Sequence, residues 1–440
     1  IFSRKDIFNG SSFKMISVKS DRTHYIENIN RDMIGQEVIL GGWVEDLRKM
    51  GKMTFLTLRD ATGITQIILT SDVMKSIGDI TRQSVVRVIG KIQDTRARDF
   101  ECEIKADEIN ILAKAVHPLP IDPIGRLESH IDNRLNSRAL DMRNQKTASI
   151  FKIRHHVLTS LRKTFIENKF TEITTPKIIG SASEGGANLF SLDYFGKQAY
   201  LAQSPQLYKE QMTIGLERVF EIASFYRAEK SHTGRHLSEF TSVDLEAAFM
   251  DYTDVMNVLE NLVLNTFKYV SENCTKEQKI IGNEIVVPNN PFKKITYSQA
   301  LDELNGKDAK LEFGNDLLDS HLRILGENHP SFYFLTDWPI KLKPFYIMEK
   351  EDDPNLSESF DLQYGYLELS SGGSRLHNPE KIKARLKEQN LDPSKFSEHL
   401  QAFDWGMPPH AGWGLGLERL LTVILGIDNV REVILYPRDP

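Results

Sequence analysis

Cysteine and long apolar runs are both scarce in this chain. Cys102 and Cys274 are the two cysteines among 440 residues, and their wide separation gives neither zinc-site spacing nor a disulfide framework. We expect both to be ordinary thiols. Because no run reaches the roughly 18 apolar residues of a membrane helix, and residues 1–19 lack a signal-peptide pattern, we expect a soluble, cytoplasmic protein with no membrane partner.

Signatures of the common nucleotide-binding folds are also absent. No glycine-rich loop ends in Lys-Ser or Lys-Thr, and no G-x-G-x-x-G fingerprint follows a strand pattern, which argues against the parallel-sheet nucleotide folds. There is no internal repeat or low-complexity tract. The length of 440 residues and the 40% hydrophobic content instead indicate more than one domain with a large core.

Charge is divided unevenly along the chain. The formal net charge is −6, which argues weakly against a nucleic-acid partner. Basic residues slightly outnumber acidic ones in residues 1–116, however, so the acidic excess lies beyond that point. The first part of the chain can therefore face a polyanion.

Short apolar runs broken by turns predict an N-terminal barrel. Five strands, with one helical piece at 72–80, indicate a small all-β barrel of the OB type over residues 21–115. The expected strands are 38–44, 52–59, 64–70, 84–92 and 100–112. In the second strand Phe55 shares a face with Met53 and Thr57. The pattern leaves open whether Phe55 belongs to the core or to the surface.

The rest of the chain divides into a linker and a larger domain. Residues 1–20 are an N-terminal extension, and the proline-rich run 117–125 opens a linker that we place at 116–146. A helical apolar period begins at Thr147, so we expect the second domain over 147–440. Within it, 170–176 is predicted to be a strand closed by Pro176, and 267–327 a less regular insertion.

The most informative motif is Phe225-Tyr-Arg227-Ala-Glu229, followed by Arg235-His236. An arginine and a glutamate two apart on a strand point to one face, where the arginine can clamp a phosphate. Residues 412–419 form a glycine-rich start to an apolar helix. Arg419 in its first turn can hold phosphates beside free backbone N–H groups. Tight packing alone is the alternative for this second pattern.

A pair of carboxylates indicates a metal beside these phosphates. Asp361 and Glu368 lie seven residues apart, and two carboxylates are a usual way of holding Mg2+ next to substrate phosphates. Solvated surface charge is the alternative for either acid alone. The following segment, Ser370-Ser-Gly-Gly-Ser-Arg375, permits close backbone approach and ends on a guanidinium suited to a carboxylate.

In this order, the motifs resemble those of the class II aminoacyl-tRNA synthetases, and specifically the aspartyl-tRNA synthetases of the archaeal and eukaryotic type. The resemblance runs from about residue 21 to the end. It rests on the helix and strand ending at Pro176, on the Arg227 motif and on the Arg419 motif. It implies an α+β catalytic domain on a mostly antiparallel sheet flanked by helices, and a homodimer formed through the first motif around Pro176.

The resemblance implies an ATP site. Arg227 looks like the arginine at the α-phosphate, Phe240 like the aromatic beneath adenine, and Arg419 like the arginine at the γ-phosphate. When a carboxylate attacks the α-phosphorus, fixed cations of this kind stabilise the negative charge that builds up. The reaction requires no protein nucleophile. The implied catalytic residues are Arg227, Glu229 and Arg419, the further ATP contacts are Arg235, His236, Phe240 and Glu368, and the Mg2+ ligands are Asp361 and Glu368.

A second set is implied to select the amino acid. Arg375 and Lys209 would pair with the side-chain carboxylate of aspartate, and a neutral amide cannot satisfy two buried cations. Gln206 and Asp244 would contact the ammonium group or orient the lysine. As the alternative, Lys209 is a helix surface charge. The full set is Ser183, Glu184, Gln206, Lys209, Asp244, Ser371 and Arg375, of which Ser183 and Glu184 resemble a loop that closes over the bound amino acid.

In the N-terminal barrel, Phe55, Gln66 and Glu103 resemble the family's anticodon contacts. Stacking on an aromatic side chain contributes roughly 1–3 kcal/mol per base, and polar side chains read base edges in an unpaired loop. Glu45 stands where relaxed archaeal-type enzymes have histidine, and no proline occurs between Lys91 and Ile104. Discrimination between tRNA-Asp and tRNA-Asn therefore stays open.

The implied activity is that of an ATP-dependent aspartate-tRNA ligase with Mg2+ as cofactor. L-aspartate and ATP would form aspartyl-adenylate, and the acyl group would move to the 3'-end of tRNA-Asp, with tRNA-Asn left open. Asparaginyl-tRNA synthetase is the nearest alternative, and residues 368–375 favour the aspartate version. A non-catalytic tRNA-binding paralogue and an amino-acid ligase that makes asparagine are two further hypotheses.

Overall fold

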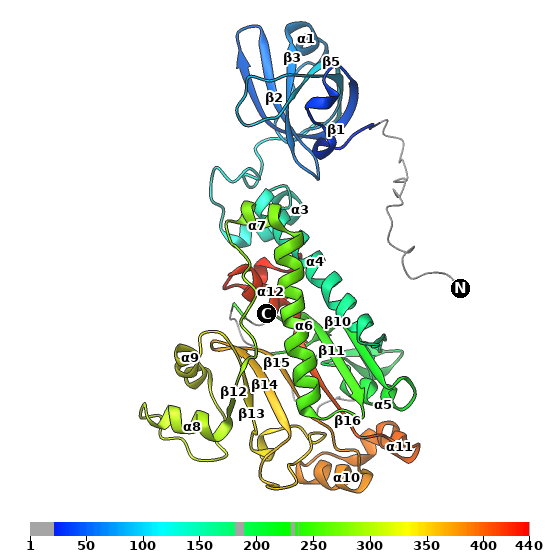
Figure 1. The fold of residues 1–440 in the computed structure, drawn as a ribbon. Coiled ribbons are helices and arrows are strands. Elements are labelled where there is room, and N and C mark those ends of the chain that lie inside the picture. The colour runs from blue at the N-terminus through cyan, green and yellow to red at the C-terminus, as the bar shows by residue number, and fades with distance from the viewer. Residues whose placement is uncertain (1–21, 181–188, 230–233, 236, 440) are drawn as a thin grey trace, which may run out of the picture. The chain divides into compact units, whose positions relative to one another are not determined.

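The structure is a computed structural model that describes residues 22–180, 189–229, 234–235 and 237–439 (Figure 1). The chain divides between Leu127 and Glu128 into two compact units. Ser183, Glu184 and His236, which the resemblance assigns to the site, lie outside the described residues. No helix within the described ranges is both long enough and apolar enough to cross a membrane.

The first unit contains a closed five-stranded barrel, which confirms the predicted OB type of architecture. Alternate side chains of its strands enter an aliphatic core that contains Val38, Leu56 and Val88. The 3-10 turns η1 (Ile26–Asn28) and η2 (Arg31–Met33) precede the barrel, and α1 (Ser71–Ile77) follows its third strand. Around the barrel, the strands are β1 (Glu37–Met50), β2 (Met53–Arg59), β3 (Ile64–Thr70), β5 (Glu103–Ala113) and β4 (Val85–Gln93).

The first strand is longer than the predicted range 38–44. Its first half pairs with β4 from Glu37 to Trp43, and its second half pairs with β2 from Trp43 to Met50. A register shift between Val44 and Asp46 marks the change of partner. A strand that passes from one neighbour to the other closes the barrel, and such pairing is not visible in the apolar pattern.

The second unit is built on an eight-stranded sheet that is antiparallel except at its two outermost pairs, which confirms the expected class. The predicted strand 170–176 is wrong in extent, because only Thr171 and Glu172 pair with the neighbouring strand. Across the sheet, the strands are β12 (Lys293–Thr296), β13 (Phe332–Thr336), β14 (Ser359–Tyr364), β15 (Leu367–Ser374), β16 (His410–Gly416), β11 (Glu239–Ala248), β10 (Arg218–Tyr226) and β6 (Thr171–Glu172).

Two long helices, α4 (Gln145–Glu167) and α6 (Tyr252–Asn273), lie side by side (Figure 1). Asn144 caps α4 by accepting from the backbone N–H groups of Lys146 and Thr147. Phe165 of α4 stacks on Phe220 of β10, with 4.3 Å between ring centroids. The predicted apolar stripe of α4 is confirmed as buried, with Ile150, Ile153, Val157, Leu161 and Phe165 in the main core.

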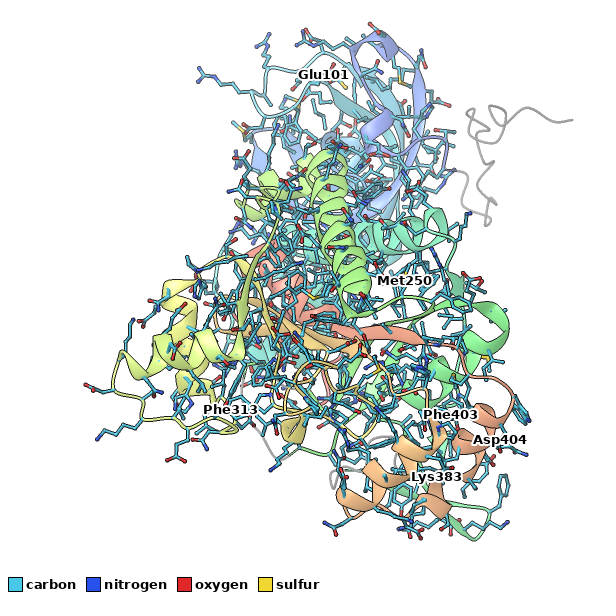
Figure 2. The ribbon with its side chains drawn as sticks, turned by 60° about the horizontal axis from the view of Figure 1, so that its bottom comes forward. Glu101, Met250, Phe313, Lys383, Phe403 and Asp404 are labelled. Atoms are coloured by element: carbon cyan, nitrogen blue, oxygen red, sulfur yellow. The ribbon has the colours of Figure 1, made fainter. Side chains whose placement is uncertain are left out.

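Shorter elements complete the second unit. Helices α10 (Pro379–Glu388) and α11 (Ser397–Asp404) pack on a smaller core that contains Phe345, Phe396 and Phe403. Phe403 of this core is labelled in Figure 2. A three-stranded sheet comprises β7 (Ile178–Ile179), β9 (Lys197–Leu201) and β8 (Ser191–Tyr194). The other elements are α2 (Ile131–Asn136), α3 (Arg138–Asp141), α5 (Gln206–Leu216), α7 (Thr275–Ile281), α8 (Tyr297–Asn305), α9 (Asp319–Asn328), η3 (Ile340–Leu342), α10 (Pro379–Glu388), η4 (Pro393–Phe396), α11 (Ser397–Asp404), α12 (Leu417–Leu425) and η5 (Val430–Glu432).

Two predicted boundaries are wrong. The linker 116–146 is too long, because α2 and α3 belong to the second unit, where Arg134 forms an ion pair with Glu432 at 2.9 Å. The predicted insertion 267–327 begins too early. Its first residues belong to α6, and Phe267 and Val270 of that helix lie in the main core. The strand β12 is also an edge of the main sheet. Another small core, distinct from the one that contains Phe345, forms where α8 and α9 pack together.

Both cysteines are free and buried, as expected of ordinary thiols. Burial raises the pKa of Cys102, and it raises the pKa of Cys274 to about 12. A reactive thiol has a lowered pKa, because the thiolate is the nucleophile. Neither cysteine is therefore a candidate for catalysis.

Candidate functional site

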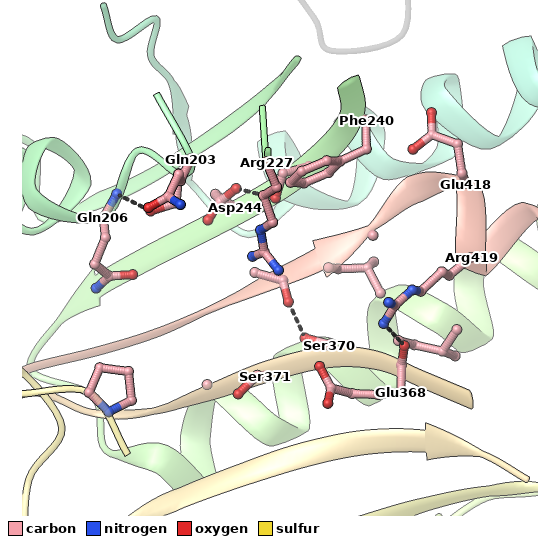
Figure 3. A pocket seen from close by; sticks show the side chains of 18 of the residues that line it. Gln203, Gln206, Arg227, Phe240, Asp244, Glu368, Ser370, Ser371, Glu418 and Arg419 are labelled. Carbon is pink, nitrogen blue, oxygen red and sulfur yellow. Dashed lines mark hydrogen bonds between the residues drawn. The ribbon is translucent and has the colours of Figure 1, made fainter. Parts of the chain in front are cut away.

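A cavity of about 290 Å³ lies over the centre of the eight-stranded sheet (Figure 3). Strands β11, β15 and β16 line it, together with the segment after β10, the start of α12 and the segment 343–347. Arg227, Arg375 and Arg419, from three separate segments, therefore face one cavity. The predicted residues in its lining are Gln206, Arg227, Glu229, Arg235, Phe240, Asp244, Glu368, Ser371, Arg375 and Arg419.

Glycines on β16 keep the floor of this cavity open. Gly414 lies between Asp244 of β11 and Ser371 of β15 in one row across the sheet. Gly412 does not line the cavity, but a Cβ there would collide with the backbone oxygen of Leu245 and with the carboxylate of Glu246, so glycine is required at this position. The prediction of a helix start at 412–419 is wrong in its first part, because 412–416 belongs to this central strand and α12 begins at Leu417.

One side of the cavity carries cations beside an aromatic ring. The guanidinium of Arg227 lies 5.2 Å from the ring centroid of Phe240. Arg419 donates from Nη1 to the backbone carbonyl of Glu368 at 2.7 Å. Burial, together with the neighbouring Arg227 and Arg235, lowers the pKa of Arg419. Because arginine keeps its proton in proteins, this direction means that the guanidinium loses hydration in the cavity, and a bound anion would offset that loss.

Arg227 and Glu229 do not lie on a strand, contrary to the prediction. The strand β10 ends at Tyr226, opposite Glu239 of β11. The backbone N–H of Arg227 still donates to the carbonyl of Ser238 at 2.9 Å. Both side chains reach the cavity, so their shared environment comes from the irregular segment 227–229 after β10 and not from strand alternation.

Arg235 is held at the rim of the cavity by the α9 region. It forms an ion pair with Asp319 at 2.7 Å. The guanidinium groups of Arg235 and Arg323 lie over the ring of Tyr366, at 5.1 and 4.4 Å from its centroid. The sequence pattern of the predicted insertion carried no sign of this support.

The two predicted metal ligands, Asp361 and Glu368, lie on the neighbouring strands β14 and β15. Burial and the negative charge of Asp361 raise the pKa of Glu368, so the two carboxylates repel each other. Nζ of Lys343 lies 3.1 Å from Oδ2 of Asp361 and offsets part of this charge. Solvated surface charge is excluded for Asp361, which is 4% exposed.

These carboxylates fit Mg2+ bound together with a phosphate ligand. In the part of the chain that the structure describes, no group of three or more His, Cys, Asp or Glu side chains forms a protein-only metal site. Mg2+ is usually held by one or two carboxylates, and phosphate oxygens and water complete its octahedron. Glu368 lines the cavity, whereas Asp361 on the next strand does not. A carboxylate pair of which one member reaches a cationic cavity suits a metal that arrives with a nucleotide.

Two buried cations and two buried carboxylates form a cluster, of which Arg375 and Asp244 line the cavity. Arg375 donates to Glu246 from Nε at 2.9 Å and from Nη2 at 3.3 Å. Nζ of Lys209 lies 2.9 Å from Asp244 and 3.5 Å from Glu246. Lys209 is 2% exposed, so the alternative of a helix surface charge is wrong. Arg375 lines the cavity directly, whereas Lys209 lies behind the lining residues.

Sequence reasoning missed Glu246, the fully buried partner of Arg375. A signal was available, because Asp244 and Glu246 are two apart on β11 and share a face. Lys343 and Tyr346, which also line the cavity, come from an irregular segment with no recognisable pattern. Tyr346 lies beneath Arg375, with 5.3 Å from its ring centroid to the guanidinium carbon.

On the barrel, Phe55 belongs to the outer face and not to the core. Thr54 and Leu56 beside it on β2 are buried, whereas Phe55 is partly exposed. Register places Gln66 opposite Glu103 on the neighbouring strand, and Nε2 of Gln66 donates to Oε2 of Glu103 at 2.6 Å. The three residues expected at the anticodon thus lie on adjacent strands β2, β3 and β5.

Two known families match the chain. Residues 38–112 match the OB-fold nucleic acid binding domain, and residues 130–440 match the class II tRNA synthetases for D, K and N. The chain belongs to the class II tRNA synthetases. Its similarity to curated synthetases extends over nearly the whole length. The Aspartate--tRNA(Asp/Asn) ligase of Methanothermobacter thermautotrophicus is 43% identical over 424 residues, which cover 95% of this chain and 97% of the relative.

Other synthetases repeat this match. The Aspartate--tRNA(Asp/Asn) ligase of Sulfurisphaera tokodaii is 44% identical over 421 residues, 95% of this chain and 98% of the relative. The crystal structure of asparaginyl-tRNA synthetase from Pyrococcus horikoshii, complexed with asparaginyl-adenylate, has a TM-score of 0.88 at 32% identity. That similarity covers 96% of this chain and 99% of the solved one. Because relatives of both amino-acid specificities share the fold, the substrate must be argued from the site.

Proposed function

We propose that this synthetase is an ATP-dependent aspartate-tRNA ligase, which forms aspartyl-adenylate and transfers the aspartyl group to the 3'-end of tRNA-Asp. One observation carries the proposal: Arg227, Arg375 and Arg419 line a single cavity. Arg227 lies beside Phe240 and Arg419 beside Glu368, which suits a nucleotide and its phosphates. Arg375 lies with Lys209 around Glu246, which suits an acidic amino acid.

Side chains of the cavity supply position and charge to the activation step. Phe240 would stack under adenine, Arg227 would bind the α-phosphate, and Arg419 would bind the far end of the triphosphate. When the aspartate α-carboxylate attacks the α-phosphorus, negative charge builds on the non-bridging oxygens and on the leaving pyrophosphate. Fixed guanidinium groups stabilise that charge. Mg2+ held by Asp361 and Glu368 would neutralise part of the phosphate charge when bound.

An acidic side chain fits the cavity at Arg375. The bonds to Glu246 use Nε and one N–H of Nη2 of Arg375, so Nη1 and the second N–H of Nη2 remain to donate to a ligand carboxylate. Lys209 adds a second positive charge behind it. An uncharged amide would be a poorer acceptor for this pair of cations, and it would bring its own N–H groups toward them. The same cavity should therefore prefer aspartate to asparagine.

The OB barrel would bind the anticodon loop of tRNA-Asp through the face that carries Phe55, Gln66 and Glu103. We include tRNA-Asn as a second substrate, because curated relatives similar over nearly the full length are named Aspartate--tRNA(Asp/Asn) ligase. Charging of purified tRNA-Asp and tRNA-Asn with labelled aspartate tests both assignments. The proposal also includes a cytoplasmic homodimer formed through the segment around Pro176, which sedimentation would test.

Amino-acid-dependent exchange of pyrophosphate with ATP tests the activation step. With Mg2+ present, aspartate should support exchange, and asparagine at the same concentration should support it at least about 100-fold more slowly. Robust exchange with asparagine would move the assignment to asparaginyl-tRNA synthetase, the second candidate, which the similarity to the Pyrococcus horikoshii enzyme favours. No exchange with either amino acid would favour a non-catalytic tRNA-binding protein.

Replacing Phe55 with alanine should weaken tRNA charging and spare exchange. Loss of one base stack removes roughly 1–3 kcal/mol, which raises the KM for tRNA by about tenfold or more. Exchange does not require tRNA binding and should keep its rate. Leu112→Ala is the matched control, because Leu112 is an exposed apolar residue on β5 of the same barrel. Equal losses in charging and exchange would show that Phe55 supports the fold instead.

A further inference from the structure

A buried charged cluster lies behind the cavity on α5, and the proposed reaction does not use it. Glu210 is fully buried. Its Oε2 lies 3.5 Å from Nε2 of His399 on α11 and 3.5 Å from Nε2 of His410 on β16. Its other oxygen, Oε1, accepts from Nε2 of Gln206 at 2.6 Å. Because Gln206 lines the cavity, the cluster reaches the substrate site through this amide.

The bond to Glu210 decides which end of the Gln206 amide faces the cavity. A carboxylate only accepts hydrogen bonds, so the group that Gln206 turns toward Glu210 is its NH2. Figure 3 shows the amide oxygen on the side of Arg227 and Asp244. An oxygen acceptor suits a positively charged ammonium group, whereas a flipped amide would present N–H donors to it.

While it is ionised, Glu210 has only acceptors to turn toward Gln206, so the amide is held in this one orientation. Nδ1 of His410 lies 2.8 Å from the carbonyl oxygen of Pro408, and its Nε2 faces the carboxylate of Glu210. Both ring nitrogens therefore face acceptors, an arrangement that favours the doubly protonated, positively charged ring. A buried carboxylate next to a buried imidazolium is compensated, and it stays an acceptor.

The ionisation preferences of the cluster agree with this assignment. Burial opposes ionisation of Glu210, but His410 and His399 lower its pKa to about 2. Burial also lowers the pKa of His410, and Glu210 outweighs that effect and raises it. Burial lowers the pKa of His399, which favours its neutral form. The positive charge of Arg375 acts on Glu210 in the same direction as that of His410.

We propose that Glu210 is a positioning residue for amino-acid binding, which locks the Gln206 amide with its oxygen toward the cavity to accept from the ammonium group of the substrate. This inference rests on the proposed function and on the expectation from the family resemblance that the ammonium group of the amino acid lies at Gln206. The substitution Glu210→Gln would remove the lock, because the new NH2 group could face Gln206 and let that amide turn over.

The substitution Glu210→Gln tests the lock by its effect on aspartate alone. In aspartate-dependent exchange, the KM for aspartate should rise about tenfold, the loss expected for one charge-assisted hydrogen bond. The KM for ATP and kcat should change less than about twofold, because neither depends on the ammonium contact. A role confined to stability would lower the amount of active enzyme and leave the KM for aspartate unchanged.

A double-mutant cycle tests whether Glu210 affects the KM for aspartate through Gln206 or independently of it. Gln206→Ala should raise the KM for aspartate at least as much as Glu210→Gln, and the double variant should match Gln206→Ala. Glu260→Gln is the matched control, because Glu260 is a largely buried glutamate on α6 that accepts from the backbone N–H of Phe292. It should leave the KM for aspartate unchanged.

Glu210→Asp covers the case in which Glu210→Gln does not fold. It keeps the charge beside His410 but withdraws the carboxylate from Gln206, so the KM for aspartate should again rise. An unchanged KM in either folded variant, or effects that multiply in the double variant, would overturn the inference. Absence of aspartate-dependent exchange in the wild-type protein would instead overturn the proposed function, and the inference with it.

Discussion

Arg227→Ala should slow formation of aspartyl-adenylate by a factor of about 10²–10³. This is the usual effect of losing one preorganised charge donor, about 3–4 kcal/mol of transition-state stabilisation. Arg227 is fixed over Phe240 at the wall of the cavity, where charge would grow on the α-phosphate. Because that charge is larger in the transition state than in bound ATP, kcat should fall far more than ATP affinity changes.

Single-turnover adenylate formation and direct ATP binding would separate these two effects. Arg218→Ala is a matched control, because Arg218 lies at the opposite end of β10 and its guanidinium is 5.9 Å from the ring centroid of Phe170. It removes the same kind of cation–aromatic contact outside the cavity and should leave the rate within about twofold. A normal rate in Arg227→Ala would contradict the proposed role.

Arg375→Ala should abolish measurable activation of aspartate and also destabilise the protein. Arg375 is 3% exposed and holds the fully buried Glu246 with two hydrogen bonds. Removing one partner of a buried ion pair costs about 3–5 kcal/mol, because the other charge remains buried. Lys209, whose Nζ lies 3.5 Å from Glu246, would offset part of that cost.

Chemical denaturation of Arg375→Ala and of Arg375→Ala with Glu246→Gln would separate recognition from stability. The second substitution removes the uncompensated carboxylate, so the double variant should recover part of the lost free energy of unfolding. It should not recover aspartate-dependent exchange, because the guanidinium is still missing. Arg375→Lys should fold but bind aspartate weakly, because an ammonium cannot reproduce the fork of bonds. Full exchange in the double variant would exclude Arg375 from substrate recognition.

Local periodicity was a good guide to the elements of this protein. The apolar stripe of α4 and the alternation in the barrel strands are short-range patterns, and burial follows them. The first and last residues of elements and domains were harder to predict, because they depend on contacts with residues far away in the sequence. The strand after Phe170 shrinks to β6 because β10 pairs with just two of its residues. The helix α2 joins the second unit through Glu432, almost 300 residues away in the chain.

Residue roles divided in the same way. Arg227, Phe240, Glu368, Arg375 and Arg419 could be predicted from motifs, and all of them line the cavity. The contacts that hold such residues in place were not predicted. Asp319 supports Arg235, and Glu210 orients Gln206. Neither acid differs in its local sequence from an ordinary helix glutamate or aspartate, so no pattern could mark it.

The apolar periods thus indicated the barrel, and the order of the motifs indicated the family. The resemblance to that family implied the antiparallel class of the sheet and most of the charged residues that line the cavity. Strand pairing supplied the rest. Register across β11, β16 and β15 sets Asp244, Gly414 and Ser371 in one row and brings Glu246 to Arg375, 129 residues further along the chain. A buried charge acquires its partner only when such distant segments meet, because its stability depends on the neighbours that replace water.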